Sequence, residues 1–77
     1  MIDDVYIRDE SIRLGQFLKL ANLIETGSEA KPVLAAEEVA VNGETETRRG
    51  RQLRPGDVVS LRGQSARVVQ GEYDVPW

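Results

Sequence analysis

The fold is decided by the stretch Ile24–Gly56, which has the sequence IETGSEAKPVLAAEEVAVNGETETRRGRQLRPG. Its first half carries apolar residues at helical spacing, with Ala30, Val33 and Leu34 on one face. The short apolar run Val39–Val41 predicts a strand, and the Asn-Gly pair after it is a strong turn signal because both residues tolerate a positive φ. This order predicts a helix followed by a strand and a tight turn.

The start of this helix has two alternatives. Thr26 with Glu29 three residues later fits a capping box, in which each side chain satisfies a backbone donor. Pro32 lacks an N–H group and crowds the turn before it. The helix therefore either starts at Thr26 and bends at Pro32, or starts later, with Ser28 as its cap and Pro32 in its first turn.

A first helix is predicted upstream, over Leu14–Leu23, with Ser11 as its N-cap. Its apolar residues follow the spacing i, i+3, i+4 and i+7, and further residues widen the stripe toward its end. These residues are Leu14, Phe17, Leu18 and Ala21, then Leu20, Leu23 and Ile24. Before the helix, Val5–Ile7 could form a short edge strand in an otherwise solvated terminus.

The C-terminal part predicts short strands joined by tight turns. We expect a hairpin of two strands, Val58–Leu61 and Ala66–Val69, joined by the turn Arg62–Ser65. We also expect Glu44–Thr47 to pair back weakly after the Asn-Gly turn. Pro-Gly-Asp at 55–57 fits a further turn. The order favours an α+β fold, with two helices packed on one face of a small antiparallel sheet.

The chain divides into an N-terminal segment (1–12), one domain (13–70) and a C-terminal tail (71–77). Trp77 in the tail either docks on the core or stays loose. A length of 77 residues allows one core and little room for a buried catalytic cavity.

Composition excludes several classes of function. The chain has no Cys and no His, which excludes disulfides, thiolate or imidazole catalysis and the common zinc ligand sets. Glu37 and Glu38 are adjacent on a helix and point in different directions, so they do not form a carboxylate pair. We therefore expect no enzymatic activity, no cofactor and no small-molecule substrate. No apolar run reaches the length of a membrane span, so we expect no membrane partner and a cytoplasmic location.

The charge is segregated along the chain. Residues 1–46 carry four Lys/Arg and ten Asp/Glu, whereas residues 47–67 carry six Arg and only Asp57. Within the second segment, Arg48–Gln52 has no apolar periodicity and predicts a loop. The total charge of −3 conceals this basic region, and the local field favours an anionic partner.

Thr26–Gly43, with the Pro-Gly-Asp turn beyond it, resembles the core of the RNA-binding module named after ribosomal small-subunit protein four. The matching positions are Glu29-Ala30-Lys31, Val33-Leu34, Val39, Val41, Asn42-Gly43 and Pro55-Gly56-Asp57. Leu14–Leu20 and Glu46–Arg51 resemble the short, stand-alone bacterial branch of that family, the YbcJ-like proteins. The resemblance covers roughly Ser11–Val69.

This resemblance implies two antiparallel helices on a small, highly curved sheet, known as the alpha-L motif. It also implies non-catalytic binding to structured RNA, such as ribosomal or transfer RNA. The wider family often has Arg where this chain has Gly27, Pro32 and Ala35, which shifts the expected contact toward the Arg48–Arg51 loop. The residues expected to contact RNA are Lys19, Gly27, Ser28, Lys31, Arg48, Arg49, Arg51 and Arg54.

Their chemistry suits phosphate. A helix N-terminus offers unpaired N–H groups, Gly27 allows close approach of the backbone, and Ser28 adds a hydroxyl. Lys19 and Lys31 add point charges, and planar guanidinium groups fork onto phosphate oxygens. Few aromatic residues are present, which favours shape and phosphate recognition over stacking on single strands.

Other interpretations stay open. Ser28 could serve only as a cap, Lys31 could be an ordinary surface residue, and Arg54 could pair with Asp57. The arginine loop could instead bind an acidic, ribosome-associated protein, which would make the chain an interaction adaptor. The chain could also act within a larger assembly and bind weakly alone. RNA binding requires Lys19, Lys31 and the loop arginines to converge on one surface.

Overall fold

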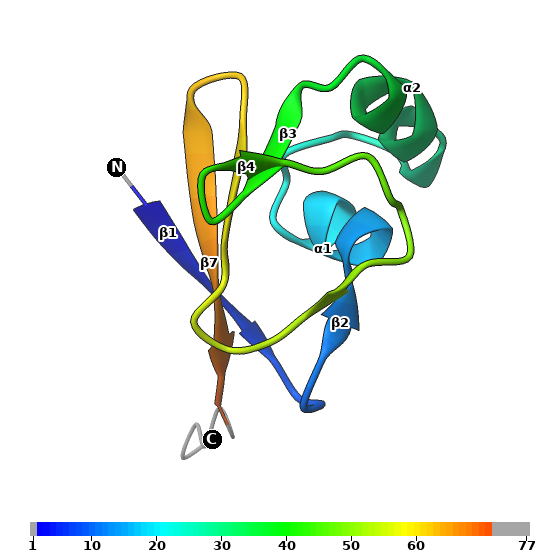
Figure 1. Cartoon of the computed structure of the whole chain (residues 1–77). Helices are drawn as coiled ribbons and strands as arrows, with labels where there is room; N and C mark the ends of the chain where they lie inside the picture. Colours follow the sequence, from blue (N-terminus) through cyan, green and yellow to red (C-terminus); the bar gives the residue numbers. More distant parts are fainter. Residues whose placement is uncertain (1, 72–77) are drawn as a thin grey trace.

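A computed structural model describes residues 2–71, and the predictions for the tail beyond Gly71 lie outside the described residues. Two short α-helices lie to one side of a twisted sheet (Figure 1). The elements in chain order are β1 (Ile2–Ile7), β2 (Ile12–Arg13), α1 (Leu14–Leu20), the 3₁₀ helix η1 (Gly27–Glu29), α2 (Ala30–Ala35), β3 (Val39–Val41), β4 (Glu44–Thr45), β5 (Gln52–Leu53), β6 (Val58–Leu61) and β7 (Gln64–Gln70).

The main sheet has the strand order β1-β7-β6-β3-β4, and β2 and β5 form a separate two-stranded sheet. The predicted α+β fold is confirmed, but the main sheet is mixed and not purely antiparallel. Strands β3, β4, β6 and β7 pair antiparallel, whereas β1 lies parallel to β7, with Ile2 opposite Ser65 and Ile7 opposite Gln70. Strand β1 thus extends beyond the expected Val5–Ile7 and joins the sheet along its whole length.

Alternate residues of the strands and one face of each helix form the core. Val39 and Val41 of β3 are buried, as are Val59 and Leu61 of β6 and Ala66 and Val68 of β7, in the period of two that a half-covered sheet requires. The helices cover this face with the expected residues, which are Leu14, Phe17 and Leu18 of α1 and Ala30, Val33 and Leu34 of α2.

The first helix differs from its prediction at both ends. Arg13, not Ser11, occupies the N-cap position, and it makes no side-chain cap hydrogen bond. The helix ends at Leu20 instead of Leu23, because Asn22 adopts a positive φ of 61° and stops the helical path. Ile24, beyond the end of the helix, is buried in the core as expected. Leu20, the last residue of the helix, is 53% exposed.

The start of the second helix takes one feature from each alternative, and Ser28 is not its N-cap. Thr26 and Glu29 occupy the capping-box positions, and the chain first forms the 3₁₀ turn of η1. Helix α2 begins at Ala30 and has Pro32 in its first turn, where a missing N–H costs little. Glu37, with a φ of 59°, follows the end of this helix.

The turns follow the sequence signals, with small shifts in strand length. Strand β7 begins at Gln64, because Arg62 and Gly63, both with positive φ, complete the hairpin turn alone. Strand β4 is shorter than expected, and Leu53 enters β5, which pairs with Ile12 of β2.

Asn42 joins the turn after β3 to the start of β6. Its side-chain oxygen accepts the N–H of Val58 at 2.9 Å, and its amide nitrogen donates to Asp57 at 3.0 Å. Its backbone has a φ of 53°, which is strained for most side chains. Asn42 therefore stabilises the turn through both its backbone and its side chain.

Replacing Asn42 tests both contributions. Asn42→Ala loses both hydrogen bonds and places a Cβ without compensation at positive φ, so we expect a loss of about 2–3 kcal/mol in the free energy of unfolding. Asn42→Gly removes the strain and should lose less. Urea denaturation of both variants provides the measurement, and equal losses would show that the backbone strain contributes nothing.

Candidate nucleic-acid interface

The arginine loop, residues 46–51, is fixed to the start of α1 by its backbone. The carbonyl oxygen of Arg51 accepts the N–H of Leu14 at 2.8 Å, and that of Arg49 accepts the N–H of Gly15 at 3.0 Å. The first N–H groups of a helix have no partner within the helix, so these carbonyls take the place of the predicted Ser11 cap. At the other end of the loop, the N–H of Glu46 donates to Val39 at 2.9 Å.

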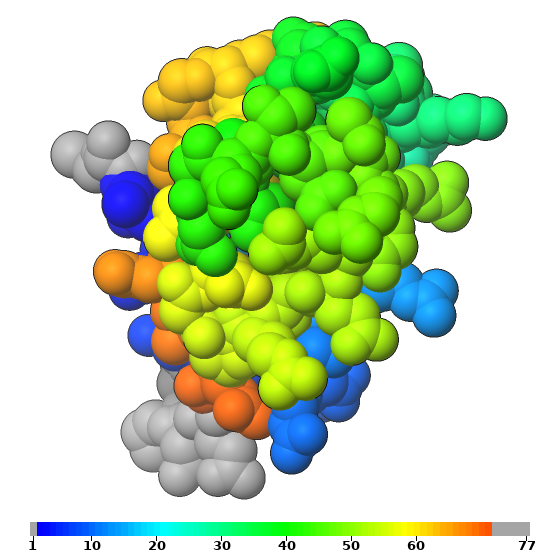
Figure 2. Space-filling model, in the orientation of Figure 1, coloured from blue at the N-terminus to red at the C-terminus, as the bar shows by residue number. Residues whose placement is uncertain are grey.

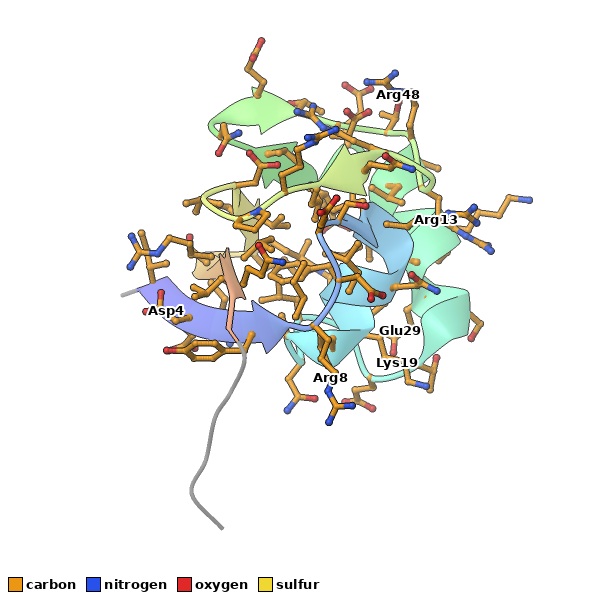
Figure 3. All side chains as sticks on the ribbon, turned by 90° about the horizontal axis from the view of Figure 1, so that it is seen from below. Asp4, Arg8, Arg13, Lys19, Glu29 and Arg48 are labelled. Carbon is orange, nitrogen blue, oxygen red and sulfur yellow. The ribbon has the colours of Figure 1, made fainter. Side chains whose placement is uncertain are left out.

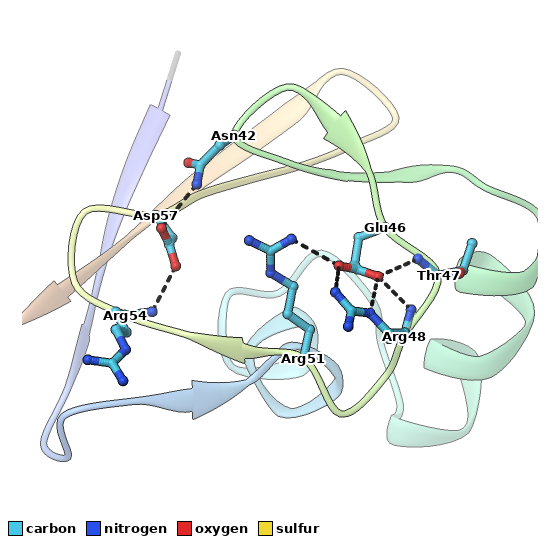
Figure 4. Close-up of polar contacts among 7 residues, drawn as sticks. All are labelled: Asn42, Glu46, Thr47, Arg48, Arg51, Arg54 and Asp57. Carbon is cyan, nitrogen blue, oxygen red and sulfur yellow. Dashed lines mark hydrogen bonds and ion pairs between the residues drawn. The ribbon is translucent and has the colours of Figure 1, made fainter.

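Glu46 is the buried charge at the centre of the arginine loop, and only 6% of it is exposed (Figure 4). Its carboxylate accepts Arg48 Nε at 3.1 Å and Arg51 Nη1 at 2.9 Å. It also accepts the backbone N–H groups of Thr47 and Arg48. These hydrogen bonds lower the pKa of Glu46 to about 2. The Arg48 side chain has the largest effect, followed by the Arg48 N–H and then the Arg51 side chain.

The two arginines on Glu46 are therefore held, but one carboxylate does not neutralise both. The Arg48 side chain is 75% exposed, so it can still contact a partner, whereas Arg51 is 33% exposed. Figure 2 shows the segment around this loop, in green to yellow-green, across the centre of one face of the molecule. The ion pairs fix the direction of both guanidinium groups on this surface.

Arg49, the third arginine of the loop, lies over α1. A Cβ atom added to Gly15 would come within 2.6 Å of Arg49 Cγ, so the aliphatic stem of Arg49 rests on the space that this glycine leaves free. Within residues 2–71 no carboxylate forms an ion pair with Arg49. Arg49 therefore carries an unneutralised charge in a defined position.

Arg49 meets Lys19 and Gly27 at a shallow hollow of about 170 Å³, which we call the basic hollow. Its lining comprises Gly15, Gln16, Lys19, Gly27, Ala30 and Arg49. Residues from α1, from the start of the second helical unit and from the arginine loop thus line one site. It contains two cations and no acidic residue.

The helix start beside the basic hollow keeps two open backbone donors. The Glu29 carboxylate accepts the N–H groups of Glu25 and Thr26 at 3.0 and 3.1 Å, whereas those of Gly27 and Ser28 have no partner among the described residues. Ser28 Oγ lies 2.9 Å from Thr26 Oγ1, in the cap itself. The open N–H groups therefore suit an anion better than the Ser28 hydroxyl does.

Of the residues expected to contact RNA, Lys19, Gly27 and Arg49 line the basic hollow, whereas Ser28, Arg48 and Arg51 do not. Lys31 and Arg54 also lie outside it. Lys31 is exposed in α2 and follows Ala30, which lines the hollow. Arg54 lies in the turn after β5, where Asp57 accepts its backbone N–H at 2.8 Å (Figure 4). Its guanidinium makes no ion pair within residues 2–71, so the considered pairing with Asp57 involves only the backbone of Arg54.

The remaining ion pairs lie elsewhere on the surface. Arg62 pairs with Glu38 and Arg67 pairs with Asp4, each at 2.9 Å. Figure 3 shows Asp4 on the opposite side of the molecule from Arg13 and Lys19. Arg67 therefore lies away from Lys19, and neither Arg62 nor Arg67 lines the basic hollow.

The sequence interpretation missed three residues of this site. The pattern predicts only a weakly paired strand at Glu46, although an acid directly before an arginine cluster is a signal for an ion pair. Gly15 is an isolated glycine in a helical pattern, which often marks a close approach. No signal in the sequence placed Gln16 beside Arg49.

Comparison with known proteins decides the family. The profile described as the S4 domain matches residues 5–69. The chain belongs to the S4 domain family. This S4 domain is 51% identical over 63 residues to the "Probable ribosome maturation protein RlbA" of Bacillus subtilis strain 168. That match covers 82% of this chain and 89% of RlbA. It is 38% identical over 58 residues to YbcJ of Escherichia coli K12, a protein whose name proposes RNA binding, and the match covers 75% of the chain and 83% of YbcJ.

Solved structures agree with this assignment. The solution structure of YbcJ from Escherichia coli, described as having an alpha-L motif involved in RNA binding, matches with a TM-score of 0.63 and 32% identity over 88% of this chain and 85% of that chain. Ribosomal protein S4e of Thermoplasma acidophilum matches with a TM-score of 0.64 and 29% identity over 84% of this chain. The match spans about a third (34%) of the S4e chain.

This S4 domain is not an enzyme, since a family without catalytic function accounts for residues 5–69. Within residues 2–71 no three His, Cys, Asp or Glu side chains group to hold a metal ion. None of the helices in that range combines the length and apolar character needed to cross a membrane.

The pKa of Glu46 predicts how stability depends on pH. Because its folded-state value of about 2 lies below its ordinary value of 4.5, ionised Glu46 stabilises the fold above about pH 5, and this contribution declines as the pH falls toward 2. We expect Glu46→Gln to lower the free energy of unfolding by about 1–3 kcal/mol at pH 7. The difference from wild type should shrink between pH 5 and pH 2.

Urea denaturation across this pH range measures the effect. Glu44→Gln, at an exposed neighbouring residue, is the matched control and should leave the curve unchanged. A Glu46→Gln deficit that stays constant down to pH 2 would contradict the assigned role of the charge.

Proposed function

We propose that this S4 domain is a non-catalytic, cytoplasmic RNA-binding protein that recognises structured RNA. The observation that carries the proposal is the basic hollow, where Lys19 and Arg49 meet beside the open N–H group of Gly27. The family assignment supports it, because YbcJ, a relative with the same fold, is described as having a motif involved in RNA binding.

In this proposal one phosphate occupies the basic hollow. Lys19 and Arg49 provide charge, and the N–H groups of Gly27 and Ser28 provide hydrogen bonds. Arg48 and Arg51 on Glu46 contact neighbouring phosphates, and Lys31 and Arg54 lie at the edges of the surface. Ion pairs hold Arg48 and Arg51, and backbone hydrogen bonds fix the loop that carries Arg49. These arginines therefore match one spacing of phosphates and so recognise the shape of a folded RNA.

Ribosomal RNA is the proposed class of partner. The name of RlbA refers to ribosome maturation, and S4e is a ribosomal protein. The acidic remainder of the chain supports an oriented approach, since it would repel RNA from the other surfaces. We propose transfer RNA only as a competitor in the binding test.

Removing the charges of the basic hollow should weaken RNA binding. If the complex makes about three to five phosphate contacts, log affinity should fall with log salt with a slope of roughly −2 to −4. Lys19→Gln combined with Arg49→Gln should make this slope shallower by about 1 to 2. Filter binding or fluorescence anisotropy with ribosomal RNA fragments over a range of salt provides the measurement.

The matched control is Arg62→Gln combined with Arg67→Gln, which removes the same number of charges from two arginines that pair with Glu38 and Asp4 and do not line the basic hollow. It should leave the slope nearly unchanged. Equal effects of the two double variants would mean that only net charge matters, and a flat salt dependence in the wild type would contradict RNA binding through phosphates.

Association with an acidic protein that survives nuclease treatment would favour the interaction adaptor instead of RNA binding.

A second variant tests the placement of Arg49 without removing charge. In Gly15→Ala the new Cβ would lie 2.6 Å from Arg49 Cγ, so the Arg49 side chain must shift from its present position over α1. Ala is also the better helix former, and the helix should gain up to about 1 kcal/mol. We expect RNA affinity to fall several-fold while thermal stability is retained or rises. Retained affinity would show that the position of Arg49 on α1 does not matter.

A further inference from the structure

The outer face of α1 carries an apolar hollow beside the basic one. Ile12, Gln16, Lys19 and Leu20 line this hollow of about 530 Å³, which we call the apolar hollow. Leu20 is 53% exposed there, because the helix ends at Leu20 and the chain turns away at Asn22. A second hollow of about 310 Å³, which Tyr6, Arg8 and Asp9 help to line, shares Ile12, Gln16 and Leu20 and continues the surface.

The apolar and basic hollows share two residues. Gln16 and Lys19 line both, and they lie one helical turn apart on α1. A ligand anchored by a phosphate in the basic hollow therefore has its adjoining groups beside the apolar one.

We propose that the apolar hollow receives one unpaired base of the RNA that binds the basic hollow. This inference rests on the proposed function and specifies its ligand as a helical RNA with a bulged or looped nucleotide. The geometry points to a base because the apolar faces of Ile12 and Leu20 suit its flat ring. The Gln16 amide, which both donates and accepts hydrogen bonds, suits the edge of that ring.

Charge and size favour a base over a protein segment. No carboxylate lines the apolar hollow, and Lys19 lies at its junction with the basic one, as a nucleotide requires. A stable protein interface buries on the order of 1,200–2,000 Å² with a substantial apolar centre. Two aliphatic side chains, Ile12 of β2 and Leu20 of α1, provide a platform for a single ring and not for such an interface.

The test compares two hairpin RNAs that differ only in one nucleotide bulged from the stem. Wild-type protein should bind the bulged hairpin about fivefold or more tightly, because the base removes exposed aliphatic surface of Leu20 and Ile12 from water. Leu20→Gln should reduce this ratio to about one and leave the affinity for the paired hairpin within about twofold. Ile2→Gln, at an exposed apolar residue in β1, is the matched control and should keep the ratio.

A fluorescent base reports the contact directly. With 2-aminopurine at the bulge, emission should rise on binding to wild type, because the base leaves the helical stack for an aliphatic surface, and it should not rise with Leu20→Gln.

Equal wild-type affinity for both hairpins would overturn this inference and leave the proposed function intact. Failure to bind either hairpin would overturn the proposed function itself. If Leu20→Gln abolishes capture of a protein partner while the RNA ratio persists, the apolar hollow is a protein contact and the inference fails.

Discussion

Two backbone hydrogen bonds at the start of α1 determine where the basic groups of this S4 domain lie. The N–H groups of Leu14 and Gly15 need acceptors, and no side-chain cap serves them, so the carbonyls of Arg51 and Arg49 do. A loop that would otherwise be free is thereby held across the helix. The requirement of a helix end for hydrogen-bond partners thus places Arg49 over Gly15 and beside Lys19.

Glu46 supplies the second constraint on the same loop. A buried carboxylate is costly unless it is paired and hydrogen-bonded, and this one accepts bonds from two guanidinium groups and two backbone N–H groups. The acid reduces the net charge of the loop, but it also directs Arg48 and Arg51. In a chain with a formal charge of −3, a few cations in fixed positions define the anion-binding surface more sharply than a larger flexible cluster would.

Local signals in the sequence predicted most of the fold. The spacing of Val33 and Leu34, the Asn-Gly turn and the Pro-Gly-Asp turn each depend on neighbouring residues, and the structure follows them. The pairing of β1 with β7 depends on residues more than sixty positions apart and left no such signal. The same holds for the site, because the arginine cluster is visible in the sequence, whereas its contacts with Glu46 and Gly15 arise from the path of the chain.

The parallel pairing of β1 with β7 also has a consequence for how the chain folds. Strand β1 cannot pair until β7 has been synthesised, so Ile2–Ile7 waits while the elements between these two strands are made. Closing so long a loop is slow compared with forming a hairpin such as β6–β7. Asp3 and Asp4 place two acidic side chains on this edge strand, and charges on an edge strand disfavour pairing with other chains.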